Sequence, residues 1–369
     1  MPTRKLTVDE IRRAAEHLAR DIERLVRRPL RLMEVCGTHT VAIFRSGIRE
    51  LLPPELELVS GPGCPVCVTP AEYIDQAVRY SRQPDVLIAS FGDMLRVPGS
   101  FSSLLAEKAA GADVRVVYSP LDAVQLAGEY PGKTVIFLAV GFETTAPAAA
   151  AAIVTAERAG LPNFLTLSAP KLVPPALKHL LDGSGTQVDG FLLPGHVCAV
   201  TGLEPFGFLA VEYGVPAVVA GFEGLDILQA IRALLENLAA GSPEIGNQYG
   251  RVVRAAGNPE ACHILEEVYE PVDSRWRGIG DIPVSGLKVR ESYRRLDAAA
   301  VRPLPAIAGT KAAADGCRCG QVLQGLIRPA QCPLFGRQCT PERPVGACMV
   351  SGEGTCAAWY KYGAGRWQQ

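Results

Sequence analysis

The sequence predicts an α/β protein with two similar parallel-sheet domains and a cysteine-rich C-terminal segment. From residue 31 onward, short apolar runs of strand length alternate with helical patterns, as expected of right-handed βαβ units. These runs form two sets of four, one before and one after residue 130. Beyond residue 316, glycine, proline and cysteine largely replace aliphatic residues, so this segment needs a metal or cluster to build a core.

The first expected element is an amphipathic helix that begins with the capping box Thr7-Val8-Asp9-Glu10. Its apolar residues recur every three or four positions, which predicts one buried face. The expected strands follow at 32–35, 56–59, 86–89 and 114–117 in the first set, and at 135–138, 164–167, 191–193 and 217–219 in the second. A helix is expected at 225–238, and the pattern between 245 and 315 is too mixed to divide.

Three domains are therefore expected. Residues 1–130 form the first α/β domain, residues 131–245 the second, and residues 246–369 a connecting region with the cysteine-rich segment. In parallel sheets the functional loops gather at the carboxyl ends of the strands. The loops after the first three strands of each set should then line two facing rims, with a site in the cleft between the domains.

Composition narrows the class of function. The chain has 369 residues and a formal net charge of −1, so no charge excess suggests binding to nucleic acid or to an anionic membrane. Neither a signal peptide nor a transmembrane helix is indicated, and a cytoplasmic location is expected. Eleven cysteines in such a chain are typical of metal binding or redox chemistry rather than of a secreted disulfide framework.

The segment Gly61-Pro62-Gly63-Cys64-Pro65-Val66-Cys67 is the first candidate for such chemistry. It follows an apolar run and precedes Thr69-Pro70-Ala71-Glu72, which is expected to cap a helix with Pro70 at its first position. Two thiols before a helix N-terminus favour the thiolate form. We expect a redox pair or a metal-handling pair; a buried thiol pair and half of a metal site are the alternatives.

Further candidates lie where other strands are expected to end. Cys36 is followed by His39, which places a thiol beside an imidazole that could serve as nucleophile, metal ligand or core histidine. Glu143, Asp93 and His196 follow other strands and are candidate polar groups of the same site. The remaining histidines and the isolated Cys198 and Cys262 are interpreted as structural.

Six cysteines crowd into the C-terminal segment. Structural zinc sites usually contain paired C-x₂₋₄-C knuckles, and this segment has none. Wide and irregular spacing favours an iron–sulfur cluster over zinc. The cysteines are Cys317, Cys319, Cys332, Cys339, Cys348 and Cys356.

Five motifs together resemble the HypD family of [NiFe]-hydrogenase maturation proteins, from about residue 30 to 362. The resemblance implies two Rossmann-like domains, a small iron–sulfur domain, and a scaffold on which the Fe(CN)₂CO unit is assembled. HypC would be a partner and HypE the source of cyanide. The motifs are Cys36-Gly37-Thr38-His39-Thr40, Gly61 to Pro70, Gly141-Phe142-Glu143-Thr144-Thr145, Pro194-Gly195-His196-Val197, and the cysteine-rich tail.

The resemblance also implies roles for individual cysteines. Cys36 would bind the iron together with a cysteine of HypC, and Cys64 and Cys67 would form the redox pair. The family pattern C-x₁₄-C-x₆-C-x₁₆-C assigns a [4Fe-4S] cluster to Cys317, Cys332, Cys339 and Cys356. Cys319 and Cys348 would remain as a second dithiol, a layout similar to that of ferredoxin-thioredoxin reductase.

The chain departs from the family at two positions. Val41 stands where many members have a second histidine, so that position cannot be a ligand, and Cys198 stands where serine is common. Two other functions fit the sequence. A free-standing [4Fe-4S] disulfide reductase would turn over with an electron donor such as ferredoxin, and a zinc-stapled α/β interaction module would contain zinc without iron.

Overall fold

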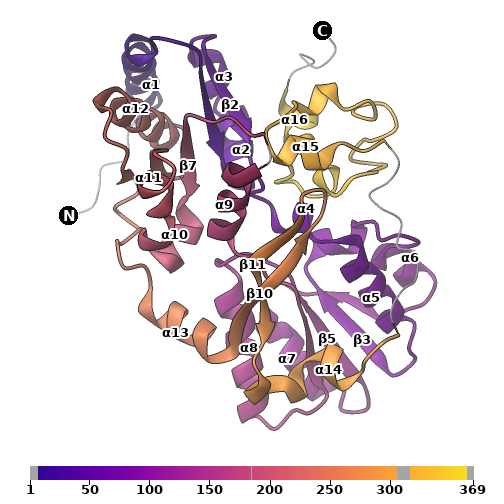
Figure 1. Cartoon of the computed structure of the whole chain (residues 1–369). Helices are drawn as coiled ribbons and strands as arrows, with labels where there is room; N and C mark the ends of the chain where they lie inside the picture. Colours follow the sequence, from indigo (N-terminus) through magenta and orange to yellow (C-terminus); the bar gives the residue numbers. More distant parts are fainter. Residues whose placement is uncertain (1–6, 184, 306–315, 364–369) are drawn as a thin grey trace.

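The computed structural model describes residues 7–183, 185–305 and 316–363 and confirms the α/β class. Two parallel sheets account for nine of the strands, and the yellow C-terminal segment lies beside them (Figure 1). The outermost parts of the expected first and third domains, residues 1–6 and 364–369, lie outside the described residues, as do residues 306–315. Over the described residues, no helix combines the length and apolar composition needed to span a bilayer.

Sheet A is five-stranded and parallel, with the strand order β2-β1-β7-β8-β9. Sheet B is four-stranded and parallel, with the order β4-β3-β5-β6. Sheet A contains β1 (Leu30–Glu34), β2 (Leu56–Ser60), β7 (Gly190–Pro194), β8 (Ala217–Ala220) and β9 (Ile245–Asn247). Sheet B contains β3 (Val86–Ser90), β4 (Val114–Val116), β5 (Thr134–Ala139) and β6 (Phe164–Ser168).

All eight expected strands are present, but their grouping differs from the expected one. β3 and β4 pair with the strands that follow them and not with β1 and β2, so the two sets of four are wrong. The chain builds β1 and β2 of sheet A, crosses to make the whole of sheet B, and returns at β7. A boundary near residue 130 therefore divides the strands of sheet B.

Helices cover both faces of each sheet because alternate strand residues point to opposite sides. One face of sheet A packs on α1 and α12, and the other on α9 and part of the cysteine-rich segment. Sheet B lies between α7 and α8 on one side and α5 and α6 on the other. These helices are α1 (Val8–Leu25), α5 (Ala71–Ser81), α6 (Leu104–Ala109), α7 (Pro120–Glu129), α8 (Ala146–Arg158), α9 (Val173–Gly183) and α12 (Gly224–Ala240).

Most of the shorter elements lie around the edges of the sheets. α1 begins at the expected capping box, whose Thr7 and Glu10 contacts are both made. The short elements are α2 (Gly37–Arg45), α3 (Ile48–Leu51), α4 (Pro65–Val68), α10 (Gly195–Thr201), α11 (Phe208–Val211), α13 (Pro259–Val268), α14 (Ala298–Val301), α15 (Cys319–Leu323) and α16 (Thr355–Tyr362). The 3₁₀ turns are η1 (Gly92–Arg96), η2 (Glu204–Phe206), η3 (Glu291–Leu296), η4 (Pro329–Gln331) and η5 (Ala347–Met349).

A long antiparallel hairpin occupies the region that the sequence pattern left undivided. Its strands are β10 (Tyr269–Trp276) and β11 (Gly280–Val289). The hairpin runs up through the middle of the molecule, and its turn lies next to α4 (Figure 1). It therefore links the two sheets to the cysteine-rich segment.

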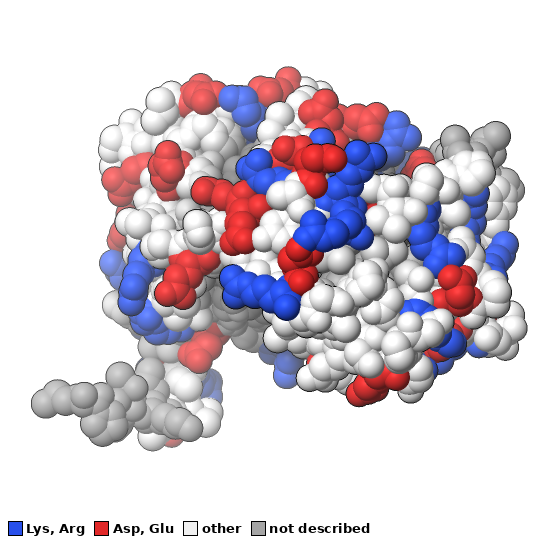
Figure 2. Space-filling view, turned by 90° about the horizontal axis from the view of Figure 1, so that it is seen from below, with Lys and Arg blue, Asp and Glu red and all other residues white. Residues whose placement is uncertain are grey.

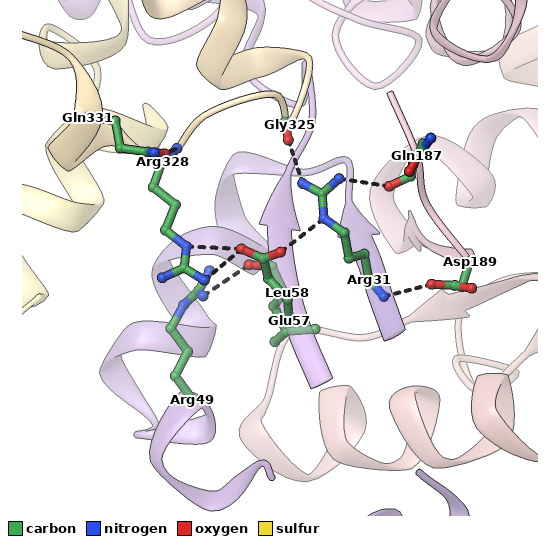
Figure 3. A network of polar contacts seen from close by, with 9 residues as sticks. All are labelled: Arg31, Arg49, Glu57, Leu58, Gln187, Asp189, Gly325, Arg328 and Gln331. Atoms are coloured by element: carbon green, nitrogen blue, oxygen red, sulfur yellow. Dashed lines mark hydrogen bonds and ion pairs between the residues drawn. The ribbon is translucent and has the colours of Figure 1, made fainter. Parts of the chain in front are cut away.

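An ion-pair network fastens the cysteine-rich segment to sheet A (Figure 3). Glu57 of β2 accepts from Arg31 Nε at 2.9 Å through one carboxylate oxygen and from Arg328 Nε at 2.9 Å through the other. Arg31 Nη2 also donates to the carbonyl of Gly325 at 2.6 Å. Each arginine thus joins a strand of sheet A to the chain that follows α15.

Charges of both signs alternate over the face seen from below (Figure 2). This face therefore presents no large surface of one sign. Ion pairs in the described part of the chain include Lys288 with Glu270 at 2.7 Å and Arg294 with Glu291 at 3.1 Å.

Candidate functional site

The candidate site lies at the carboxyl edge of sheet A. In the order β2-β1-β7-β8-β9, the connections from β1 and β7 lead to opposite sides, so these neighbouring strands form a topological switch point. Ligands in open α/β sheets bind at such a point. Cys36 directly follows the carboxyl end of β1, and His196 lies just beyond β7.

Cys36 is held at the N-terminus of α2. It is the N-cap residue, and its side chain makes no capping hydrogen bond. Burial raises the pKa of the Cys36 thiol to about 12, although the nearby backbone N–H groups of His39 and Thr38 lower it. A metal ion that bound this sulfur would displace its proton.

Glu34 holds the backbone before Cys36, and sequence reasoning missed it. One of its oxygens accepts from the Cys36 backbone N–H at 3.1 Å, and the other from Thr40 Oγ1 at 2.5 Å. Burial raises the pKa of this carboxyl to about 7. The sequence offered one signal for Glu34: it is an acid within an apolar strand, where burying an ionisable group costs free energy unless the group is hydrogen-bonded.

Gly63 brings the second cysteine motif against the first. A Cβ atom on Gly63 would lie 2.3 Å from the backbone nitrogen of Cys36 and 2.5 Å from its Cα. The carbonyl of Gly63 also accepts from Gly37 N at 3.0 Å. The expectation that these motifs meet at one rim is therefore correct for Cys36 and the Cys64 loop.

Cys64 and Cys67 lie in and just before α4, a short helix that the sequence did not predict. Cys64 is its N-cap, and its sulfur accepts from Cys67 N at 3.4 Å. The expected capping box at Thr69 is wrong, because Thr69 Oγ1 donates to the carbonyl of Pro65 at 2.8 Å. Pro70 is the N-cap of α5 and makes no side-chain cap.

A series of thiols leads from Cys67 into the cysteine-rich segment. Cys67 is fully buried, and burial raises the pKa of its thiol, which donates to the carbonyl of Ala347 at 3.9 Å and lies beside the thiol of Cys348. Cys348 in turn contacts the thiols of Cys319 and Cys356, and Cys319 contacts Cys317. Adjacent sulfurs therefore connect the Cys64 loop with the tail.

The tail cysteines surround one mostly apolar hollow. Leu334, Phe335 and Met349 form its apolar walls. Gly346 also lines it, and a side chain there would clash with a cysteine, because a Cβ at this position would lie 2.6 Å from Cys317 Sγ. All four cysteines of the family pattern line it, together with the two others: Cys317, Cys332, Cys339, Cys356, Cys319 and Cys348.

The side chains that line the hollow offer sulfur donors, the kind of ligand that an iron–sulfur cluster would take. Across the described ranges, no three His, Cys, Asp or Glu side chains are grouped so that they could hold one metal ion. A [4Fe-4S] cluster does not need three ligands around one metal ion, because each cysteine binds a different iron atom. Cys339 Sγ accepts a backbone N–H from Val345 at 3.3 Å, the kind of hydrogen bond that cluster ligands receive.

The two site histidines are joined by an aromatic ring. Phe222, just after β8, stacks on His39 with a centroid distance of 4.8 Å and on His196 at 3.8 Å. His39 Nε2 lies 3.0 Å from the carbonyl of Gly221, which assigns the proton to that nitrogen. Burial lowers the pKa of His39 to about 4, so Nδ1 is an unprotonated, buried atom for which the described residues provide no partner.

Glu143 approaches the site from sheet B. Its Oε1 accepts from Val173 N at 2.8 Å, while Oε2 is buried and has no hydrogen-bond partner among the described residues. Burial raises the pKa of Glu143 to about 7. After burial, the charges of Glu143 and then Cys36 raise the pKa of Cys198, so this thiol lies close to both groups.

The other charged groups of the rim have different surroundings. Asp93 pairs with Arg96 at 3.5 Å, and Arg96 also donates to the carbonyl of Val350 at 2.7 Å. Lys171, which sequence reasoning missed, is buried beside β6, and its ammonium donates to Ser274 Oγ at 2.5 Å. Burial lowers the pKa of Lys171 to about 8.

The fold and site define an α/β protein that carries a buried thiol centre at the edge of a parallel sheet. Comparison with known proteins identifies the family. A family model described as "HypD: Hydrogenase formation hypA family" matches residues 11–363. The chain belongs to this family.

Known relatives agree with this assignment. The hydrogenase maturation factor HypD of Rhodobacter capsulatus is 46% identical over 361 residues, which cover 97% of this chain and 94% of that protein. HypD of Escherichia coli is 45% identical over 357 residues, covering 96% and 94%. The hydrogenase expression/formation protein HupD of Azotobacter chroococcum is 46% identical over 346 residues, covering 92% and 91%. The protein is thus a hydrogenase maturation factor.

Proposed function

We propose that the protein is a cytoplasmic scaffold on which the Fe(CN)₂CO unit of [NiFe]-hydrogenases is assembled. Cys36 binds the iron together with a cysteine of HypC, and HypE delivers the cyanide. Low-spin iron with cyanide and carbon monoxide is a soft centre that suits thiolate. The buried Cys36 thiol at the start of α2 and the unpartnered His39 Nδ1 and Glu143 Oε2 support a polar, buried place for this cargo.

Cys64 and Cys67 act in this proposal as a dithiol/disulfide pair. The observation that carries it is the series of thiols from Cys67 through Cys348 to Cys319 and Cys356. Cys317, Cys332, Cys339 and Cys356 would hold the [4Fe-4S] cluster, which, when bound, supplies single electrons. Cys319 and Cys348 form a second dithiol between the cluster ligands and the redox pair.

The assignment of Cys36 is tested with the protein purified anaerobically together with HypC. Cys36→Ala should lose the infrared bands of cyanide and carbon monoxide and keep the visible absorption of the cluster. Cys198→Ser is the matched control, because it removes a neighbouring buried thiol that is not assigned to the iron. Bands that persist in Cys36→Ala would refute the assignment.

Metal analysis of the same preparation distinguishes the proposed scaffold from the two alternative functions. Iron is expected to match acid-labile sulfide in the cluster and to exceed it by one atom for each bound Fe(CN)₂CO unit, whereas zinc without iron would indicate a zinc-stapled module. Turnover of a protein disulfide with ferredoxin, in the absence of any diatomic-ligated iron, would indicate a free-standing disulfide reductase.

A further inference from the structure

The turn of the β10–β11 hairpin is wedged between the two cysteine-bearing parts of the molecule. The backbone N–H of Arg277 donates to the carbonyl of Val68, the residue after Cys67, at 2.8 Å. The next residue, Gly278, has φ +75° and abuts Gly320, which follows Cys319. A Cβ atom on Gly320 would lie 1.9 Å from the carbonyl oxygen of Gly278, so only glycine permits this approach.

The Arg277 guanidinium is fixed beside the redox pair by backbone carbonyls. Its Nε donates to Thr69 at 2.6 Å and its Nη2 to Pro98 at 2.8 Å. The strand before the turn is anchored by Trp276, which is fully buried and donates from Nε1 to Ser285 Oγ at 2.8 Å. The position of the cation is therefore set by the fold and not by a flexible ion pair.

The charges near Arg277 are those of two sulfurs and two carboxylates, Cys319, Glu72, Cys67 and Asp75. Among the described residues, no carboxylate lies within ion-pair distance of Arg277. The nearby acids are engaged, Glu72 by Arg275 at 3.5 Å and Asp75 by the Ser100 backbone at 2.7 Å. Burial lowers the pKa of Arg277, and the sulfurs of Cys319 and Cys67 are among the charges that oppose this shift. An arginine nevertheless stays charged at any physiological pH.

We propose that Arg277 is a positioning residue whose fixed positive charge raises the reduction potential of the Cys64–Cys67 pair. The inference rests on the proposed function, in which this pair cycles between dithiol and disulfide. A neighbouring cation stabilises the thiolate that forms when the disulfide is reduced and has little effect on the neutral disulfide. Arg277 thus makes the disulfide easier to reduce.

The test uses thiol–disulfide exchange between dithiothreitol and the Cys64–Cys67 pair. Dithiothreitol transfers two electrons and one proton to the protein and releases its second proton to the solvent: the Cys64–Cys67 bond breaks, one thiol and one thiolate form, and the reagent closes to its cyclic disulfide. The ratio of reduced to oxidised reagent at the midpoint gives the equilibrium constant. Trypsin releases both cysteines in one peptide, residues 50–79, which contains no other cysteine. Alkylation of this peptide therefore reports this pair alone.

The experiment compares the full-length protein with Arg277→Gln and Arg277→Lys under strict exclusion of oxygen. The pair in Arg277→Gln should be about tenfold harder to reduce, a shift of about 30 mV to more negative potential for a two-electron couple. Arg277→Lys keeps the charge and should stay within about twofold of the natural protein. The control Arg302→Gln removes an arginine that is bonded to Asp85 and Gln83 before β3, and should cause no shift.

The outcomes separate this inference from the proposed function. If peptide 50–79 of the natural protein never forms a disulfide over the accessible range, the redox role of the pair is refuted, and with it the basis of the inference. If the disulfide forms but Arg277→Gln leaves the midpoint unchanged, only the inference is overturned. If Arg277→Gln does not fold, the lysine variant still decides, because a tenfold shift with the charge retained would overturn the electrostatic role.

Discussion

Gly63 is the point at which the two cysteine motifs touch, and Gly63→Ala tests whether their contact matters. The added methyl group would lie 2.3 Å from Cys36 N and 2.5 Å from Cys36 Cα. Ordinary van der Waals contact for such atoms begins at about 3.4 Å, so the loop or the start of α2 must move by about 1 Å. Both neighbours are backbone atoms, which cannot turn aside as a side chain could.

The expected cost follows from this overlap. Forcing one methyl group into a filled site typically costs about 1–3 kcal/mol. A shift of the same size would displace the start of α2, whose N-cap residue is Cys36. We therefore expect Gly63→Ala to lower the free energy of unfolding by about 2 kcal/mol and to reduce the amount of bound Fe(CN)₂CO.

Urea unfolding and infrared spectroscopy of the complex with HypC measure the two effects. Gly132→Ala is the matched control, because a Cβ at that position meets no atom within 4 Å and the backbone is not left-handed. It should leave both quantities unchanged. Equal stability and equal cargo in the two variants would refute the idea that the Gly63 contact aligns the site.

Two further predictions concern stability. Because the folded-state pKa of Glu143 is raised to about 7, the folded protein keeps a proton that the unfolded chain loses above its ordinary pKa of 4.5. As the pH rises from 5 to 8, Glu143 should thus lower the free energy of unfolding by about 2–3 kcal/mol. Urea titrations at several pH values should show that Glu143→Gln removes this dependence on pH. An unchanged pH dependence in the variant would contradict the prediction. Glu57→Gln should lower the free energy of unfolding by about 1–2 kcal/mol and speed hydrogen exchange in residues 319–331. The control Glu291→Gln, at an exposed ion pair, should do neither. Equal exchange rates in the two variants would show that the ion pairs of Glu57 do not hold the cysteine-rich segment.

The strands could be predicted because each is a short apolar run, but their pairing could not. All eight expected strands formed within two residues of the expected ends. Sequence order suggested that β3 and β4 belong with β1 and β2, whereas the chain crosses to a second sheet after β2. Which sheet a strand joins depends on packing of its two faces, and a fully buried parallel strand looks the same in either sheet.

Site residues were predictable where a motif marked them and not where tertiary contacts define them. Cys36, Cys64, Cys67 and the tail cysteines stood out by type and spacing. Arg277 did not, since an arginine in a turn usually faces solvent, and only the fold shows it against the thiols. The hairpin strand Tyr269–Trp276 alternates in burial, but its sequence does not alternate between apolar and polar residues, so the pattern did not mark it.

The crossing of the chain between the sheets has a consequence for the order of folding. All strands of sheet B lie between residues 86 and 168, so this unit can form on the ribosome while the β1–β2 pair still lacks its neighbour β7. The rim around Cys36 closes only after β7 has been synthesised, and the thiols of the tail arrive last of all. A nascent chain therefore exposes Cys36 without its pocket, and under the proposed function the completed protein is the earliest species that could hold the iron.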